Sequence, residues 1–165
     1  MTRFFDLDEA NTTLPEVRTI LEALRDERAE LIRLRDQVVE SQAASEAASE
    51  APTKANVRGT RGSTAPAEPA DSGETSKGDG DPSDAALRVL RLRMQGVIDQ
   101  MQAGVARIDE LGVTLREIET GLIDFPALVT GRQVWLCWRL GEGDIDWWHE
   151  MDEGFGGRLP LAELT

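Results

Sequence analysis

The sequence predicts an α+β protein: a long antiparallel helical hairpin, coiled-coil-like, with a small C-terminal antiparallel β unit. Two segments of similar length repeat apolar residues with heptad spacing, which indicates paired helices. A low-complexity stretch separates them, and short alternating segments bounded by turn residues follow the second. These patterns divide the chain into residues 1–40, 41–83, 84–112 and 113–165.

Residues 1–40 are expected to form the first helix. Asp6 with Glu9 three residues later makes a capping box, and Pro15 suits the first turn of the main helix. The apolar heptad positions are Leu14, Val17, Leu21, Leu24, Leu31 and Val38. Residues 41–83 consist mostly of Ala, Ser, Gly, Thr, Pro and acids. Such a segment cannot bury enough apolar surface to offset the entropy of ordering, so we predict that it is disordered.

Residues 84–112 are expected to form the second helix. Their heptad positions are Leu87, Leu90, Met94, Val97, Met101, Ile108 and Leu111. Gly104 falls at a d position, where the missing side chain would let the helices approach closely, and Gly112 suits the position just after the helix. Matched length and periodicity favour an antiparallel hairpin, although a coiled coil between molecules would give the same pattern.

Residues 113–165 read as a two- to four-stranded β unit. Pro126 is expected to end the second strand, residues 141–144 to form a hairpin turn, and residues 150–160 to form a Gly-rich loop. The expected strands are residues 113–118, 122–125, 133–140 and 145–149. A sheet this small needs something to pack on, and the base of the helical hairpin is the obvious candidate.

The composition disfavours two classes of binding partner and indicates a cellular compartment. Acids outnumber bases 31 to 18, for a net charge of -13, which disfavours nucleic acids and anionic membrane surfaces. The single cysteine, Cys137, excludes an internal disulfide framework and fits a reducing compartment. No signal peptide and no long apolar stretch is visible. We therefore expect a cytoplasmic protein with no nucleic-acid or membrane partner.

The last third of the chain holds the side chains suited to chemistry. Candidate ligands for a divalent metal ion are His149, Glu150, Asp152, Glu153, Glu119, Asp124 and Cys137. Their spacing matches neither the H-E-x-x-H zinc motif nor an EF-hand loop. A lone histidine followed by acids also suits a solvated turn, so the metal is a candidate cofactor and no more.

The strand register decides whether Cys137 and His149 can meet. If Leu140 pairs with Ile145, Cys137 lies opposite Trp148 and His149 points to the other face. A bulged turn would shift the pairing by one and place Cys137 and His149 diagonally on one face. The sequence leaves both registers open. Cys137 also suits the interior as a small buried hydrophobe.

The four tryptophans have two interpretations. Aromatic clusters on small sheets usually form core and cross-strand packing. Trp147 and Trp148 are adjacent, so they point to opposite faces, and one of them is exposed unless a loop covers it. An exposed ring would indicate a recognition surface. The candidates for such a surface are Trp138, Trp147, Trp148, Arg139, Phe155 and Arg158.

Several segments together resemble a known family. They are residues 5–11 (FDLDEAN) with 14–16 (LPE), residues 119–127 (ETGLIDFPA), and residues 137–142 (CWRLGE) followed by 148–150 (WHE) and 152–155 (DEGF). In combination they resemble domain of unknown function 2203, a set of small prokaryotic proteins. The resemblance implies no activity or cofactor. The long insert departs from the compact pattern of that family.

The sequence is consistent with two functions. The first is a non-enzymatic binding or scaffold protein that presents a Trp-rich, acidic surface and associates with itself or with a protein partner. It is favoured because no recognisable catalytic set accompanies the heptads. The alternative is a metal-binding protein or metal-dependent enzyme that uses His149 and neighbouring carboxylates, with Glu150 or Glu153 as a base.

Overall fold

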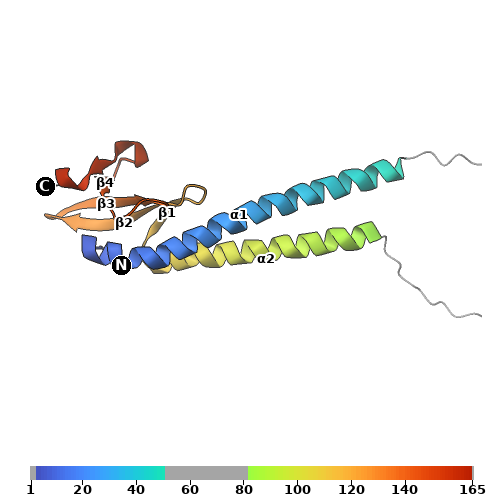
Figure 1. Ribbon diagram of the computed structural model, residues 1–165, viewed down its shortest axis with the longest axis horizontal. Coiled ribbons are helices and arrows are strands. Elements are labelled where there is room, and N and C mark those ends of the chain that lie inside the picture. The colour runs from blue at the N-terminus through green and yellow to red at the C-terminus, as the bar shows by residue number, and fades with distance from the viewer. Residues whose placement is uncertain (1–2, 51–81, 165) are drawn as a thin grey trace, which may run out of the picture.

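A computed structural model of the chain describes residues 3–50 and 82–164. Helix α1 (Leu7–Ser49) and helix α2 (Pro82–Glu110) run antiparallel, and a five-stranded sheet lies at one end of the pair (Figure 1). This arrangement confirms the predicted α+β class. Helix α1 extends beyond residue 40 because the run that follows is rich in alanine, the strongest helix former. The rest of the segment predicted to be disordered, residues 51–81, lies outside the described residues.

The hairpin packs through most of its predicted heptad positions in the half nearest the sheet. Farther along α1, Leu34 is buried although it was not among those positions, whereas Leu31 and Val38 are only partly buried. Asp6 caps α1, and its side chain accepts a hydrogen bond of 2.7 Å from the backbone N–H of Glu9. A Cβ atom added at Gly104 would lie 2.9 Å from Cδ2 of Leu24, so the glycine does allow the predicted close approach. The buried side chains of the two helices include Leu14, Val17, Leu21, Leu24, Leu34, Leu87, Val97 and Ile108.

A Schellman motif ends α2 and turns the chain into the sheet. Gly112 has φ of 82°, and its N–H bonds to the Asp109 carbonyl at 2.8 Å. The N–H of Val113 bonds to the Ile108 carbonyl at 3.2 Å. Among the described residues, neither helix is long and apolar enough to cross a membrane.

The sheet is antiparallel, and its strands follow one another in chain order. Two short 3₁₀ helices, η1 (Phe155–Gly157) and η2 (Leu161–Glu163), flank the last strand. The strands are β1 (Thr114–Glu117), β2 (Leu122–Val129), β3 (Arg132–Arg139), β4 (Trp147–Glu150) and β5 (Leu159–Pro160). The fifth strand lies in the segment expected to be a loop.

The expectation that Pro126 ends a strand is wrong, because β2 continues to Val129. In an antiparallel strand, the N and carbonyl O of one residue face the same side. The Pro126 carbonyl accepts the N–H of Phe5 at 2.8 Å, so its nitrogen faces away from β3. The pairing of β1 with β2 stops at Asp124. The nitrogen of Pro126 therefore faces a side of β2 on which β1 requires no hydrogen bond from it.

One face of the sheet packs on the base of the hairpin. Its side chains belong to the same buried cluster as Leu14, Val17 and Leu21 of α1. They are Ile123, Phe125, Ala127, Val134, Leu136, Trp138 and Trp148. The side chains that alternate with them must therefore lie on the opposite face of the sheet, which we call the outer face.

Candidate metal centre on the outer face

The observed register brings Cys137 and His149 to the same face. Cys137 lies opposite Trp147 on β4 and opposite Asp124 on β2, while Trp135 lies opposite His149. This is the shifted register of the two left open by the sequence. Cys137 and His149 are diagonal neighbours on the outer face, and Asp124 reaches the same point from the other side of β3.

The three side chains form one cluster of donor atoms. A carboxylate oxygen of Asp124, the Sγ of Cys137 and a ring nitrogen of His149 all lie within 4.8 Å of one another. All three residues are almost fully buried, with 2%, 1% and 1% of their surface exposed. Among residues 3–50 and 82–164, no fourth His, Cys, Asp or Glu side chain joins the cluster. Side chains on the outer face of a sheet are ordinarily hydrated, so this degree of burial needs an explanation.

The hydrogen bond of His149 fixes the role of its ring. Nδ1 lies 2.8 Å from the backbone carbonyl of Glu150, which can only accept, so Nδ1 carries a hydrogen. Nε2 then directs its lone pair into the cluster when the ring is neutral. It lies 3.2 Å from Oδ2 of Asp124, but the two atoms are not aligned for a hydrogen bond. Nε2 of His149 and Oδ1 of Asp124 thus have no hydrogen-bond partner among the described residues.

Two arginine–tryptophan pairs cover the cluster. Arg116 of β1 donates from Nε to Oδ2 of Asp124 at 2.7 Å and stacks over Trp135 at 4.8 Å. Arg158 stacks over Trp147 at 5.0 Å. Because Trp135 and Trp147 flank Cys137 on the outer face, these pairs account for the exclusion of water from it.

The environment keeps Cys137 protonated in the absence of a cation. Burial, followed by the negative charge of Asp124, raises the pKa of the Cys137 thiol to about 12. The nearby positive charge of Arg158 acts in the opposite direction. A thiol with such a pKa is a poor nucleophile at neutral pH, so the Cys–His–Asp set does not resemble an activated cysteine centre.

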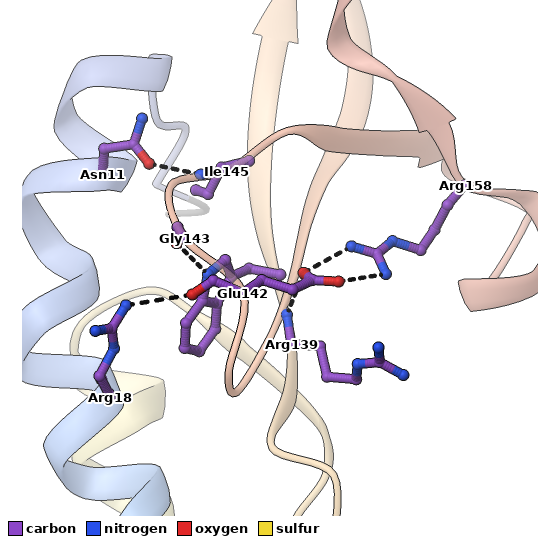
Figure 2. Close-up of polar contacts among 8 residues, drawn as sticks. Asn11, Arg18, Arg139, Glu142, Gly143, Ile145 and Arg158 are labelled. Atoms are coloured by element: carbon purple, nitrogen blue, oxygen red, sulfur yellow. Dashed lines mark hydrogen bonds and ion pairs between the residues drawn. The ribbon is translucent and has the colours of Figure 1, made fainter.

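A tightly bonded loop holds Arg158 in place (Figure 2). Its Nη1 and Nη2 donate to Oε1 and Oε2 of Glu142 at 2.9 and 2.8 Å. The loop that carries Glu142 is fastened to the rest of the fold, because Ile145 N–H bonds to Oδ1 of Asn11 at 2.9 Å and Trp138 Nε1 bonds to the Gly143 carbonyl at 2.8 Å. Although burial alone would raise the pKa of Glu142, the bonds from Arg158 and from a backbone N–H lower it.

The structure separates the remaining predicted ligands from the cluster. Glu119 is exposed and pairs with Arg28 of α1 at 3.1 Å. Glu150 lies on the opposite face of β4 from His149 and pairs with Arg132 at 3.1 Å. Asp152 and Glu153 are exposed in the segment after β4. These four residues are therefore not gathered with Asp124, Cys137 and His149.

The residues predicted to form a recognition surface lie partly in the core and partly at the surface. Trp138 and Trp148 are 0% and 3% exposed and belong to the core. Trp147 is half-buried under Arg158, and Phe155 is exposed beneath Arg139 and Arg158.

Sequence reasoning did not single out Arg116, although Arg116 bonds directly to the cluster. Alternation along β1 puts Arg116 on the same face as Thr114, but the sequence does not show that Thr114 pairs with Asp124 or that the pairing is irregular between Leu115 and Glu117.

Comparison with known proteins gives one result. The family described as "Uncharacterized conserved protein (DUF2203)" matches residues 3–161. The chain therefore belongs to this family, which the resemblance of its end segments had indicated. No curated protein and no solved structure matches the chain.

Proposed function

We propose that the protein binds a divalent transition-metal ion through Asp124, Cys137 and His149. The observation that carries this proposal is that two buried polar atoms beside Cys137, His149 Nε2 and Asp124 Oδ1, have no hydrogen-bond partner among the described residues. Nε2 lies 3.2 Å from the other Asp124 oxygen, Oδ2, which accepts the bond from Arg116. Buried polar atoms left without partners cost about 1–3 kcal/mol each. A cation between these atoms and Sγ of Cys137 would satisfy all three at once.

The donor set selects the class of metal. A thiolate sulfur, an imidazole nitrogen and a carboxylate oxygen suit Zn²⁺ and neighbouring transition metals, whereas Mg²⁺ and Ca²⁺ prefer oxygen alone. Bonds of about 2.0–2.3 Å in a tetrahedral centre place ligand atoms roughly 3.3–3.8 Å apart. The three donors lie within 4.8 Å of one another, so closing the centre needs shifts of only about 1 Å, within reach of side-chain rotation.

The surroundings supply what a metal centre needs beyond its ligands. A ligating histidine usually donates its other N–H to a carbonyl or carboxylate, and His149 Nδ1 does so to Glu150. Ligating carboxylates are likewise held by hydrogen bonds, and Arg116 holds Asp124. Three protein ligands leave one position of a tetrahedral ion free, which is typical of exchangeable or catalytic centres.

The test is metal content and affinity in protein purified without a histidine tag. We expect stoichiometric zinc by elemental analysis, and tight Zn²⁺ binding by the metal-free protein in competition with a chromophoric chelator. His149→Ala should weaken this binding by more than the roughly 10–100-fold that loss of a supporting residue costs. Asp152→Asn is the matched control, because it removes a neighbouring carboxylate that lies outside the cluster. Equal affinity in the wild type and His149→Ala would refute the proposal.

The binding or scaffold function stays a second candidate. What favours it is that α2 exposes Val89 and Leu92, three residues apart on one helical face, at 64% and 74%. A second copy of the chain is the simplest partner for such a face. Light scattering should show a mass that rises with concentration and falls to that of a monomer in Leu92→Asp. A monomeric wild type at high concentration would exclude self-association.

A further inference from the structure

Arg158, in the segment between η1 and β5, lies near enough to the cluster for its positive charge to act on the Cys137 thiol. Strand pairing places Trp147 directly beside Cys137 on the outer face, and the Arg158 guanidinium stacks on that ring at 5.0 Å. The Arg158 side chain is 9% exposed. It is therefore a buried cation at the edge of the site, held there by Glu142 (Figure 2).

The hydrogen bonds of Arg158 leave one donor unused. Glu142 takes one hydrogen from Nη1 and one from Nη2, which is the bidentate pairing of a carboxylate with the end of the guanidinium. The Nε–H is buried and has no partner among the described residues. An unpaired donor on a charged group near a candidate metal centre is suited to a ligand that binds the metal and accepts a hydrogen bond from Arg158 at the same time.

The charges of the occupied centre point to the sign of that ligand. A divalent cation, the Asp124 carboxylate and a Cys137 thiolate sum to zero, and Arg116 then leaves one positive charge in excess. Arg158 and Glu142 neutralise each other. A buried excess charge is costly, so an anion at the free coordination position would be stabilised both by the metal and by the surrounding field.

We infer that the free coordination position takes a small oxyanion, such as a carboxylate or phosphate, and that the Arg158 Nε–H orients it. This inference rests on the proposed metal site. It assigns Arg158 a role in selecting the ligand rather than in holding the metal. The aromatic rings of Trp147 and Phe155, on which Arg158 stacks at 5.0 and 4.8 Å, would limit the size of what enters.

The experiment uses the full chain loaded with Co²⁺, whose visible absorption reports on coordination. Acetate and inorganic phosphate are titrated separately at constant ionic strength set by perchlorate. We expect a saturable change in the absorption with either anion in the wild type. Arg158→Lys keeps the positive charge beside Glu142 but lacks the Nε–H, and it should weaken anion binding about tenfold or more while leaving Co²⁺ affinity nearly unchanged.

Arg132→Lys is the matched control. Arg132 also stacks on a tryptophan and pairs with a glutamate, at 5.1 and 3.1 Å, but it lies by Trp148 on the core side of the sheet. It should leave anion affinity unchanged. Circular dichroism verifies that both variants are folded, and the wild-type titration decides the first part of the inference without either variant.

The outcomes separate this inference from the proposed function. Failure of the wild type to bind Co²⁺ overturns both. Binding of Co²⁺ with no response to acetate or phosphate overturns the inference and leaves the metal site standing. An anion response of equal affinity in the wild type and Arg158→Lys overturns the role of Arg158.

Discussion

Replacement of His149 by leucine discriminates a metal ligand from a structural core residue. His149 is 1% exposed, and leucine has a similar volume, so the substitution neither opens a large cavity nor overfills the site. A histidine present only for packing would be fully hydrogen-bonded, and its loss would destabilise the fold. A histidine retained for a ligand would be expected to cost stability when the ligand is absent.

The magnitude follows from the contacts of the ring. The substitution removes one hydrogen bond, from Nδ1 to the Glu150 carbonyl, worth about 0.5–1.5 kcal/mol. It also removes the unpaired Nε2, whose burial costs about 1–3 kcal/mol, and adds apolar contacts. Glu150 is partly exposed, so water can reach the region of its carbonyl. We expect metal-free His149→Leu to be more stable than the metal-free wild type by about 1–2 kcal/mol.

The assay is urea unfolding followed by tryptophan fluorescence, in a reducing buffer with either chelator or excess Zn²⁺. Zinc at about one hundred times its dissociation constant should stabilise the wild type by about 2.7 kcal/mol and His149→Leu by nothing. Glu150→Gln, on the opposite face of the same strand, should respond to zinc as the wild type does. Destabilisation of His149→Leu by 1 kcal/mol or more in chelator, with no effect of zinc on the wild type, would refute the reasoning.

Three further predictions concern the helical frame, the loop that carries Glu142, and Cys137. Gly96→Ala should raise the free energy of unfolding by about 1 kcal/mol, because an added Cβ meets no atom within 4 Å. Gly104→Ala gains the same helix propensity, but its Cβ would lie 2.9 Å from Leu24 Cδ2, so overpacking of about 1–3 kcal/mol should cancel or outweigh that gain. A urea midpoint raised as much by Gly104→Ala as by Gly96→Ala would contradict this. Glu142→Gln should destabilise the fold at pH 7 by about 1–3 kcal/mol, because the bidentate bond to Arg158 is lost. Since the pKa of Glu142 is lowered on folding, this difference should persist above the ordinary carboxyl pKa and disappear as the pH falls through the folded value, and a difference constant down to pH 3 would contradict it. Cys137 should resist iodoacetamide at pH 8 in the folded protein and react once urea unfolds it, as mass spectrometry would show.

The helical frame could be predicted because it depends on repetition. Heptad spacing indicates which side chains face inward, and several residues predicted for the interface, such as Leu21 and Val97, are buried, although Leu34 was not predicted and Leu31 is only partly buried. The end of α1 at Ser49 was missed because low complexity was taken as disorder where alanine-rich sequence favours a helix. Strand β5 was missed because two residues give no periodic signal.

Prediction of the site depended on the register between β3 and β4, which the strand patterns leave open. A slip of one residue between β3 and β4 would turn His149 away from Cys137 and bury a different set of side chains. The loop between the two strands sets that register, and it does so through contacts distant in sequence, such as the bond from Ile145 N–H to Asn11 of α1. Strand patterns could name Asp124, Cys137 and His149 as candidates, but only the tertiary contacts of this loop bring them together.

The outer face is the best candidate for a functional site because it buries polar side chains, whereas the rest of the fold buries apolar ones. The inner face of the sheet is apolar and packs on the hairpin. On the outer face, polar side chains are buried instead beneath Arg116 with Trp135 and Arg158 with Trp147. A face that needed only to be soluble could have left these positions hydrated, and one that needed only stability could have used apolar residues. Local violations of otherwise consistent design are expected at functional sites, and the proposed cation, bound by all three donors, would explain this one.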